Sequence, residues 1–334
     1  MKKILALLMI LLLLFTLLSG CTDTEDDDLD EDENEDTDPG GSDWTEEGLS
    51  INNGWYWNPE IIILDNGTYR MYVEDHGTDG SSLIGIVILS SEDGFDWEYV
   101  DIAITAASHP GIIKLNDSYW RLYYQCGESI CSAISNDGLN FEKEEGTRLD
   151  SNTTLEGANV RHPCIVETSN GGYRMYYDTD AEDGAFIRIW SAYSDDGLSF
   201  TREGLIIDLT PYRNDWPTGF YAHSSKPEVL QTSDGKWRMF FASSTLIGSV
   251  YKPAVIRMAT SDDGINWNIK TTNYEIAAGQ QPDGKYYGTF DVSVKEINNT
   301  VRMWYCLFLS PEEGFVGDYS GIYSVSKSLD ELDN

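Results

Sequence analysis

The chain has 334 residues, of which 57 are acidic and 22 are basic, and its formal net charge is −35 at pH 7. A protein this acidic repels phosphate backbones and anionic lipid headgroups, so we expect no nucleic-acid partner and no direct docking on a membrane surface. With 41% apolar residues the chain can still bury a large core.

The first 20 residues predict a lipoprotein signal peptide. Lys2 and Lys3 precede an apolar run over 4–18, which is shorter than the roughly 20 residues of a membrane-spanning helix. The run ends at Leu18-Ser19-Gly20-Cys21, which resembles the lipobox of prokaryotic lipoproteins, where cleavage leaves a cysteine that receives lipid. An ordinary secretory signal is the alternative. We expect a protein anchored through Cys21 at the extracellular face of the cell membrane, with no other membrane contact.

Residues 21–43 predict a disordered acidic tether. The stretch 22–38 holds 12 acidic residues and no basic one, so it has little apolar surface to bury. The remaining residues, 44–334, hold 44 acidic and 20 basic residues, a net charge near −24. We expect them to form one folded domain that is a monomer.

A five-residue pattern occurs five times. Its second residue is Arg, and the other four are aromatic or apolar. The copies begin at Tyr69, Trp120, Tyr173, Trp237 and Val301. Eleven residues before each Arg stand Pro59, Pro110, Pro163, Pro227 and, in place of a fifth proline, Asp291. An apolar run and a turn cluster such as Asp65-Asn66-Gly67 lie between, which predicts strand, tight turn and strand.

A second pattern, Ser-x-Asp-Gly-x-x-aromatic, follows four of the hairpins. Its copies run over 91–97, 135–141, 194–200 and 261–267. Asp-Gly after a strand indicates another hairpin, so each repeat contains four strands. Repeats of four short strands predict an all-β fold, a five-bladed β-propeller. We expect the hairpin arginines Arg70, Arg121, Arg174 and Arg238 to pair with the Asp of these turns or with nearby carbonyls.

The fifth repeat ends before its fourth strand. Residues 44–51, Trp-Thr-Glu-Glu-Gly-Leu-Ser-Ile, match 200–207, a fourth strand of the third repeat. We therefore expect this N-terminal strand to close the ring on the last blade and to cover an open sheet edge.

Four cysteines follow Cys21. Cys126 and Cys131 flank a short turn and could be bonded or free, since an exported protein permits either. Cys164 and Cys306 are expected to be buried free thiols.

One face of the propeller carries long, individual connections, and we call it the loop face. Function is expected there, because variable loops on a rigid scaffold commonly carry it. The residues before the prolines, with Phe290 before Asp291, are expected to start the innermost strands at this face. The candidate substrate-binding residues are Trp57, Asn58, Glu74, His109, Arg161, His162, Tyr221, His223 and Lys226, and the candidate catalytic carboxylates are Glu60, Asp178 and Glu228.

Histidines and carboxylates in this set allow one metal ion. His109, His162 and His223 with Asp178 could ligate an ion near the axis. Histidines that only hydrogen-bond within the pore are the alternative, and we expect no other cofactor. Aromatic side chains such as Trp57 and Tyr221 could stack on sugars or pack the rim.

These blades, prolines and hairpins resemble the five-bladed propeller glycosidases, the arabinanase, levansucrase and invertase superfamily that includes glycoside hydrolase family 43. The resemblance implies a glycosidase that acts on an oligo- or polysaccharide with one neutral and one ionised carboxyl group.

The chain departs from that family where the family's catalytic residues stand. The family has an Asp before the proline of blade 1, a second Asp before a proline, and a Glu before the inner strand of blade 4. Here Asn58, His109, His162 and Lys226 precede the prolines, and Glu228 follows the last one. A hydrolase would have to use Glu60 or Glu74 with Asp178 or Glu228. The alternative is a glycan-binding lipoprotein without catalysis. A sialidase-like protein is a weaker third hypothesis, because its arginine triad is not evident.

Overall fold

The structure is a computed structural model that describes residues 43–52, 55–77, 80, 82–116, 118–152, 157–180, 187–209, 220–247, 250–270, 275–276, 279–280, 286–310 and 318–333. The expected signal peptide, Cys21 and the tether up to residue 42 lie outside these residues. Within the described ranges, no helix has the length and apolar character needed to cross a membrane.

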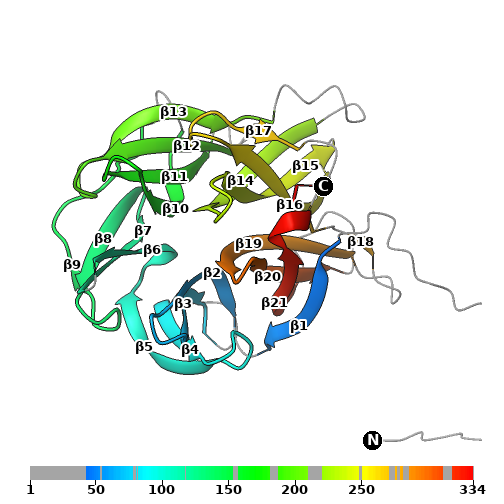
Figure 1. Cartoon of the computed structure of the whole chain (residues 1–334), viewed down its shortest axis with the longest axis horizontal. Coiled ribbons are helices and arrows are strands. Elements are labelled where there is room, and N and C mark those ends of the chain that lie inside the picture. The colour runs from blue at the N-terminus through cyan, green and yellow to red at the C-terminus, as the bar shows by residue number, and fades with distance from the viewer. Residues whose placement is uncertain are drawn as a thin grey trace, which may run out of the picture. The chain divides into compact units, whose positions relative to one another are not determined.

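Five antiparallel sheets form the blades of a propeller (Figure 1). Blade 1 consists of β2 (Tyr56–Ile63), β3 (Tyr69–Asp75), β4 (Gly85–Ser91) and β5 (Glu98–Thr105). Blade 2 consists of β6 (Ser108–Asn116), β7 (Tyr119–Cys126), β8 (Ser129–Ser135) and β9 (Glu142–Lys143). Blade 3 consists of β10 (Val160–Glu167), β11 (Tyr173–Asp180), β12 (Ile187–Ser194) and β13 (Thr201–Ile207).

Blades 4 and 5 complete the ring. Blade 4 consists of β14 (Phe220–Gln231), β15 (Trp237–Ile247), β16 (Val250–Ser261) and β17 (Asn268–Ile269). Blade 5 consists of β18 (Gly279–Gln280), β19 (Tyr286–Ile297), β20 (Thr300–Ser310), β21 (Asp318–Ser328) and β1 (Thr45–Ile51), and a 3-10 turn, η2 (Leu329–Glu331), follows it. The predicted five-bladed fold is confirmed.

The N-terminal strand closes the ring, as predicted. β1 is hydrogen-bonded to β21, so strands from the two ends of the chain lie side by side in one sheet (Figure 1). Just before β1, the indole ring of Trp44 packs edge-on against Phe240 of blade 4, with 6.2 Å between ring centroids. Phe200, its counterpart in the repeat, packs in the same way on Tyr123 at 6.0 Å.

Apolar packing lies between neighbouring blades. Five clusters of buried apolar side chains each join two blades that are adjacent in the ring. Tyr72 and Leu122 share the cluster between blades 1 and 2, and Trp44 and Phe240 share the one between blades 5 and 4. The space nearest the axis is therefore left to the polar side chains of the innermost strands.

The hairpin arginines fasten each blade to the next. Arg70, Arg121, Arg174 and Arg302 donate to the backbone carbonyls of Asp137, Asp196, Asp263 and Asp93 in the Asp-Gly turns of the following blades. Two residues later, Tyr72, Tyr123, Tyr176 and Trp304 donate to the carbonyls of the adjoining glycines. The predicted structural role is confirmed, with carbonyls as the acceptors between blades.

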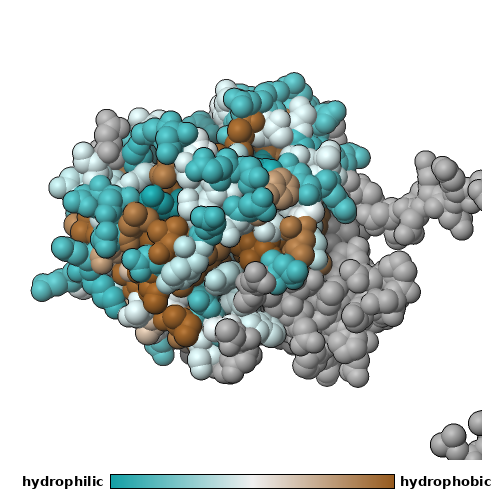
Figure 2. All heavy atoms as spheres, turned by 90° about the horizontal axis from the view of Figure 1, so that it is seen from below, coloured by the Kyte–Doolittle hydropathy of each residue, from teal (hydrophilic) through white to brown (hydrophobic). Residues whose placement is uncertain are grey.

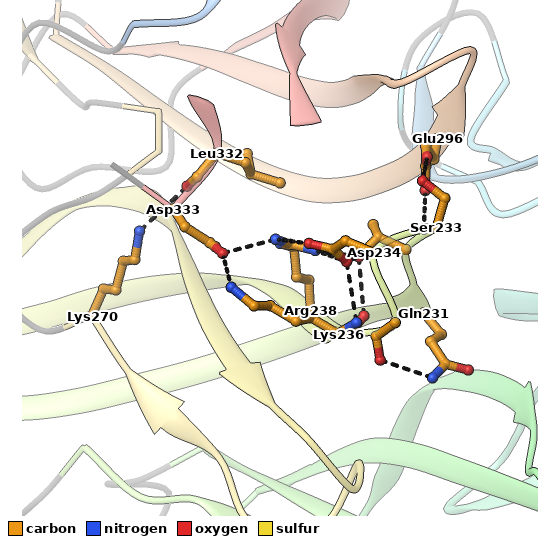
Figure 3. Close-up of polar contacts among 11 residues, drawn as sticks. Gln231, Ser233, Asp234, Lys236, Arg238, Lys270, Glu296, Leu332 and Asp333 are labelled. Carbon is orange, nitrogen blue, oxygen red and sulfur yellow. Dashed lines mark hydrogen bonds and ion pairs between the residues drawn. The ribbon is translucent and has the colours of Figure 1, made fainter. Parts of the chain in front are cut away.

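Blade 4 is the exception, because blade 5 has no Asp-Gly turn. Arg238 instead binds Asp234 of its own hairpin and Asp333, which follows η2 near the C-terminus (Figure 3). Lys236 also pairs with Asp333. The residue two positions after the arginine is Phe240 in this blade. Phenylalanine has no hydroxyl group, which fits a junction that offers no glycine carbonyl to accept a hydrogen bond.

The cysteines divide as the sequence allows. Cys126 and Cys131 form a disulfide at the end of the β7–β8 hairpin. Cys164 and Cys306 are buried free thiols, as predicted.

The outer edge of blade 1 exposes apolar side chains. Tyr99, Val100 and Ile102 of β5 are 55%, 40% and 37% exposed. β5 lies at the lower edge of the view in Figure 1, and the molecule seen from below shows apolar patches between hydrophilic ones (Figure 2).

Candidate functional site

The innermost strands begin earlier than expected from the prolines, so five residues with left-handed backbone lie inside these strands and not at their starts. They are Asn58 (φ 53°), His109 (52°), His162 (49°), Lys226 (52°) and Asp291 (51°), and we call them the axis ring. In each blade the first hairpin skips this residue and the next one, which forms a bulge. Proline has no N–H to pair, so bulges are where a strand tolerates it. The innermost strands β2, β6, β10, β14 and β19 pack on one another around the axis.

Asp291, not Phe290, is the fifth member of the axis ring, which corrects the sequence alignment. Phe290 pairs with Cys306 as Trp57 pairs with Glu74, and Val292 takes the place of the proline. The cause is the β19–β20 turn, where only Asn298 and Asn299 separate the paired strand ends. Both residues have positive φ, as the central residues of a two-residue hairpin turn do. This turn makes the hairpin one residue shorter. The Asn-Asn pair was the available sequence signal.

Glu74 anchors the blade 1 side of the axis ring. Its Oε1 accepts hydrogen bonds from Asn58 Nδ2 at 2.8 Å and from the backbone N–H of His109 at 2.5 Å, and its Oε2 lies 3.0 Å from His76 Nε2. Burial alone would raise the pKa of Glu74, but the neighbouring His109 and these hydrogen bonds lower it to about 2. The carboxylate thus joins blade 1 to blade 2.

Asp178 plays the same part between blades 3 and 4. Its Oδ1 accepts from Arg161 Nε at 3.1 Å, and its Oδ2 lies 2.6 Å from His162 Nδ1 and accepts from the Lys226 N–H at 2.9 Å. The side chain is fully buried, which works against ionisation. His162 and Arg161 outweigh that effect and hold the pKa of Asp178 below its usual range.

The two ring histidines touch each other. The rings of His109 and His162 lie edge to face with 3.9 Å between centroids. Burial, followed by the neighbouring His162, lowers the pKa of His109 to about 4, and burial also lowers the pKa of His162. Both rings are therefore neutral at neutral pH.

The described members of the metal set considered from the sequence, His109, His162 and Asp178, are not arranged to hold an ion. Among the residues described, no group of three or more His, Cys, Asp or Glu side chains is arranged to hold a metal ion. The His162 nitrogen that faces Asp178 is already hydrogen-bonded to it. The side chains of His223 and Tyr221, in β14, lie outside the described part of the chain.

Glu60 of blade 1 and Glu228 of blade 4 lie one residue beyond the prolines, and both lie near Lys295 of blade 5. Lys295 Nζ is 2.8 Å from Glu228 and 3.6 Å from Glu60. Burial and the adjacent Glu228 raise the pKa of Glu60 to about 8, and the two carboxyl groups are hydrogen-bonded. Carboxyl groups that flank a glycosidic bond stand about 5 Å or more apart, so these two do not bracket one in this arrangement.

The described residues of the predicted site fall into two layers. Asn58, His109, His162 and Lys226 belong to the axis ring, Glu74 and Asp178 anchor it, and Arg161 pairs with Asp178. Trp57 stacks on His76 with 4.6 Å between centroids. Glu60 and Glu228 form the deeper layer with Lys295, whose position is not predicted from the sequence because the fifth hairpin is one residue shorter than the pattern implies. The catalytic roles of Glu60, Asp178 and Glu228 stay predictions.

Comparison with known sequences identifies no function. No family model matches the chain. Two uncharacterized proteins from strains of Mycobacterium tuberculosis, MT1551 among them, are 26% identical over 211 residues, which cover 57% of this chain and 64% of theirs. The match thus spans less than two thirds of the length of these relatives.

Comparison with solved structures identifies the fold. A glycoside hydrolase superposes with a TM-score of 0.64 at 14% identity, over 86% of this chain and 92% of that one. An N-acetylgalactosamine deacetylase from F. plautii, in complex with blood group B trisaccharide, gives 0.64 at 13% identity, over 85% and 95%. An endo-1,4-beta-xylanase from Bacteroides thetaiotaomicron gives 0.56 at 19% identity, over 85% and 92%. The chain has the five-bladed fold of these carbohydrate-active enzymes, and their reactions differ.

Proposed function

We propose that this protein is a carbohydrate-active propeller of the glycoside hydrolase type, and that it acts on an extracellular glycan at the mouth of its axis. The observation that carries the proposal is the axis ring, where polar side chains from all five blades meet on a fold shared with carbohydrate-active enzymes. Neutral hydroxyl-rich ligands are recognised by such sets of convergent polar groups beside aromatic rings.

A hydrolase also needs carboxyl groups in different protonation states. Burial raises the pKa of Asp291, a member of the axis ring, whereas the pKa of Glu74 is lowered to about 2. This divergence supports a catalytic site, because such shifts gather where proton transfer is used.

A product assay tests the proposal. The chain from residue 40 is incubated with plant, microbial and animal polysaccharides, and released sugars are separated by chromatography. We expect release that is lost in Glu74→Gln, Asp178→Asn or Asp291→Asn and kept in Asp65→Asn, an exposed carboxylate in the β2–β3 turn. Circular dichroism checks that each variant is folded. If no polysaccharide releases sugar and none retains the protein, the proposal is refuted.

A second candidate is a glycan-binding protein without catalysis. The specific observation in its favour is that Glu74 and Asp178 are buried and each accepts several hydrogen bonds, while Asn58 stands where the resembling family has an aspartate. In the same assay, protein retained on a polysaccharide without sugar release would identify this function.

We further propose that lipid on Cys21 holds the domain at the outer surface of the cell, beyond an acidic tether. The support is the lipobox-like sequence and the charge of 22–38. Growth with a clickable fatty acid should label the protein, and Cys21→Ala should abolish the label. Equal labelling of both would contradict the anchor.

A further inference from the structure

The deeper layer joins three blades beneath the axis ring. It consists of Glu60 on β2, Glu228 on β14 and Lys295 on β19, the innermost strands of blades 1, 4 and 5 (Figure 1). Lys295 Nζ lies 2.8 Å from Glu228 Oε1 and 3.6 Å from Glu60 Oε1. Ser293 of β19 adds a second connection, because its hydroxyl accepts the Ile61 N–H at 3.1 Å and donates to Glu228 at 3.3 Å. Blades 1, 4 and 5 therefore meet in one buried polar cluster.

Glu228 is equipped to carry a negative charge in this cluster. Its Oε1 accepts from Lys295, from the Ser293 hydroxyl and, at 3.2 Å, from the Val294 N–H. Three donors on one oxygen suit a carboxylate, which only accepts hydrogen bonds, and the ammonium of Lys295 balances its charge. The side chain is 2% exposed, so these partners take the place of water.

Glu60 has no cation of its own. Among the residues that the structure describes, Lys295 is the only cationic side chain in ion-pair contact with it, and that ammonium lies nearer to Glu228. Glu60 is 7% exposed, and burying a second carboxylate beside the first without a second cation is costly. The two carboxyl groups are hydrogen-bonded to each other, which requires a proton on one of them. Burial and the adjacent Glu228 raise the pKa of Glu60, so Glu60 holds that proton at neutral pH.

The other groups that face Glu60 do not supply the missing charge. Lys226 on β14 acts on Glu60 electrostatically, but its ammonium is 3.4 Å from the Pro59 carbonyl. Cys164 on β10 is neutral, because burial raises the pKa of its thiol well above the ordinary value. Blade 2 contributes Gly111, where a side chain would collide with the backbone of blade 3. The charge of the deeper layer therefore changes by one unit when Glu60 gains or loses its proton.

We propose that the deeper layer is an alkaline switch built into the propeller axis: the hydrogen bond from protonated Glu60 to ionised Glu228 holds blades 1, 4 and 5 together, and loss of that proton replaces the bond with repulsion between two carboxylates. The Lys295 side chain is 25% exposed, so solvent reaches the cluster and hydroxide takes the proton away as water. Pro59, which precedes Glu60, accepts from Lys226 of the axis ring, so a shift of Glu60 loosens that ring as well. The switch goes beyond the proposed function and does not depend on it.

Thermal unfolding of the purified full chain between about pH 6 and pH 9 tests the switch. The folded chain keeps the proton of Glu60 up to about pH 8, whereas the unfolded chain releases it near the ordinary pKa of 4.5, so this group lowers the stability of the wild type as pH rises toward 8. Glu60→Gln keeps a neutral N–H donor for Glu228 at every pH. We expect the melting temperature of this variant to gain about 5 °C on that of the wild type across this range.

Two further variants serve as comparisons. Glu142→Gln, at an exposed position of β9, should follow the wild-type profile at every pH. Glu228→Gln leaves Glu60 as the only carboxyl group beside Lys295, so Glu60 should ionise in the folded chain and its alkaline decline in stability should disappear. If the wild type and Glu60→Gln differ by the same amount at every pH, the switch is overturned. A Glu228→Gln variant that keeps the wild-type decline also overturns it.

A measurement on the wild-type chain covers the case in which these variants fail to fold. Hydrogen exchange is followed by mass spectrometry for peptides of β2 and β19, which carry the buried Ile61 and Val294, and of β12 in blade 3, which carries the buried Ile189. After correction for the intrinsic pH dependence of exchange, protection of β2 and β19 should fall about tenfold or more between about pH 7 and pH 9, while that of β12 stays constant. Protection that is constant in all three strands, or that falls equally in all three, overturns the proposal.

Discussion

Asn58 shows how one residue changes the chemistry of the axis ring. Its amide donates to Glu74 at 2.8 Å, which an ionised aspartate, an acceptor only, cannot do. The aspartate that the resembling family has at this point would bring two carboxylates together. Restoring the family's residue would therefore not by itself restore the family's site.

This reasoning gives a prediction for Asn58→Asp. One of the two adjacent carboxyl groups must then keep a proton in the folded protein, so its folded pKa rises above the unfolded value. Because the unfolded chain ionises this carboxyl group at a lower pH than the folded chain does, the free energy of unfolding falls as pH rises. We expect a loss of about 1–3 kcal/mol at pH 7.5 and a smaller loss at pH 4.5. Urea unfolding at both pH values measures it. Asn140→Asp is the control, because Asn140 donates to Asp137 at the same 2.8 Å on an exposed turn. Equal losses in the two variants would contradict the role of burial.

His109 predicts a pH dependence of stability. Its folded pKa of about 4 lies below the ordinary 6.5, so between these values the unfolded chain binds more protons and stability falls as pH falls. The full difference corresponds to about 3 kcal/mol. His109→Gln should flatten the decline of unfolding free energy between pH 6.5 and 4.5, a range that does not extend below the ordinary pKa of Glu74, 4.5, where the contribution of that carboxylate is lost. A decline as steep as that of the wild type would disprove this assignment.

At the scale of elements, the residue type at one hairpin position depends on whether the neighbouring blade offers a hydrogen-bond acceptor. Tyr72, Tyr123, Tyr176 and Trp304 each donate a hydrogen bond to a glycine carbonyl of the next blade. At the junction without such a carbonyl, the residue is Phe240, which has no donor. Residue type at this position is thus set by tertiary contact and not by strand propensity.

Two opposite substitutions test this dependence. Tyr123→Phe removes the 2.7 Å bond to the buried Gly197 carbonyl and should cost about 1–2 kcal/mol of unfolding free energy. Phe240→Tyr should also destabilise, because it places a hydroxyl without a partner in a buried site. Tyr119→Phe, whose side chain is 48% exposed, serves as the control in urea unfolding. A neutral or stabilising Phe240→Tyr would contradict this explanation.

The repeats made the elements predictable, but not the geometry of the axis ring. Alternating strands, Asp-Gly turns and recurrent prolines are local signals, so blades and closure follow from the sequence. The left-handed bulge before each proline is not a local preference, since non-glycine residues rarely adopt positive φ. That bulge places Asn58 against Glu74 and brings Asp291 into the ring.

At the scale of the whole molecule, the ring is closed by a strand from the far end of the chain. β1 covers the edge of β21, and Glu47 pairs with Arg302 at 2.6 Å. Removing residues 1–52 should expose that edge and cause aggregation and loss of a cooperative unfolding transition, whereas removing 1–42 should not. Adding a peptide of residues 43–52 should restore the transition. A cooperative monomer without β1 would show that the strand is dispensable.

Closure also depends on the C-terminal tail, because it occupies the junction that lacks an Asp-Gly turn. Asp333 binds Arg238 at 2.9 Å and also pairs with Lys236, which ties the end of blade 5 to blade 4 (Figure 3). Arg238 is 1% exposed, so its charge depends on Asp234 and Asp333 for compensation. Asp333→Asn should therefore cost about 1–2 kcal/mol in urea unfolding, and Glu331→Gln, on the exposed side of η2, should cost almost nothing.

The pKa of Asp333 is lowered mainly by Lys236 and Arg238 against the effect of burial, so this contribution is present above about pH 4 and is lost on further acidification. If the two variants unfold alike at neutral pH, the tail is not a second closure and β1 alone completes the ring.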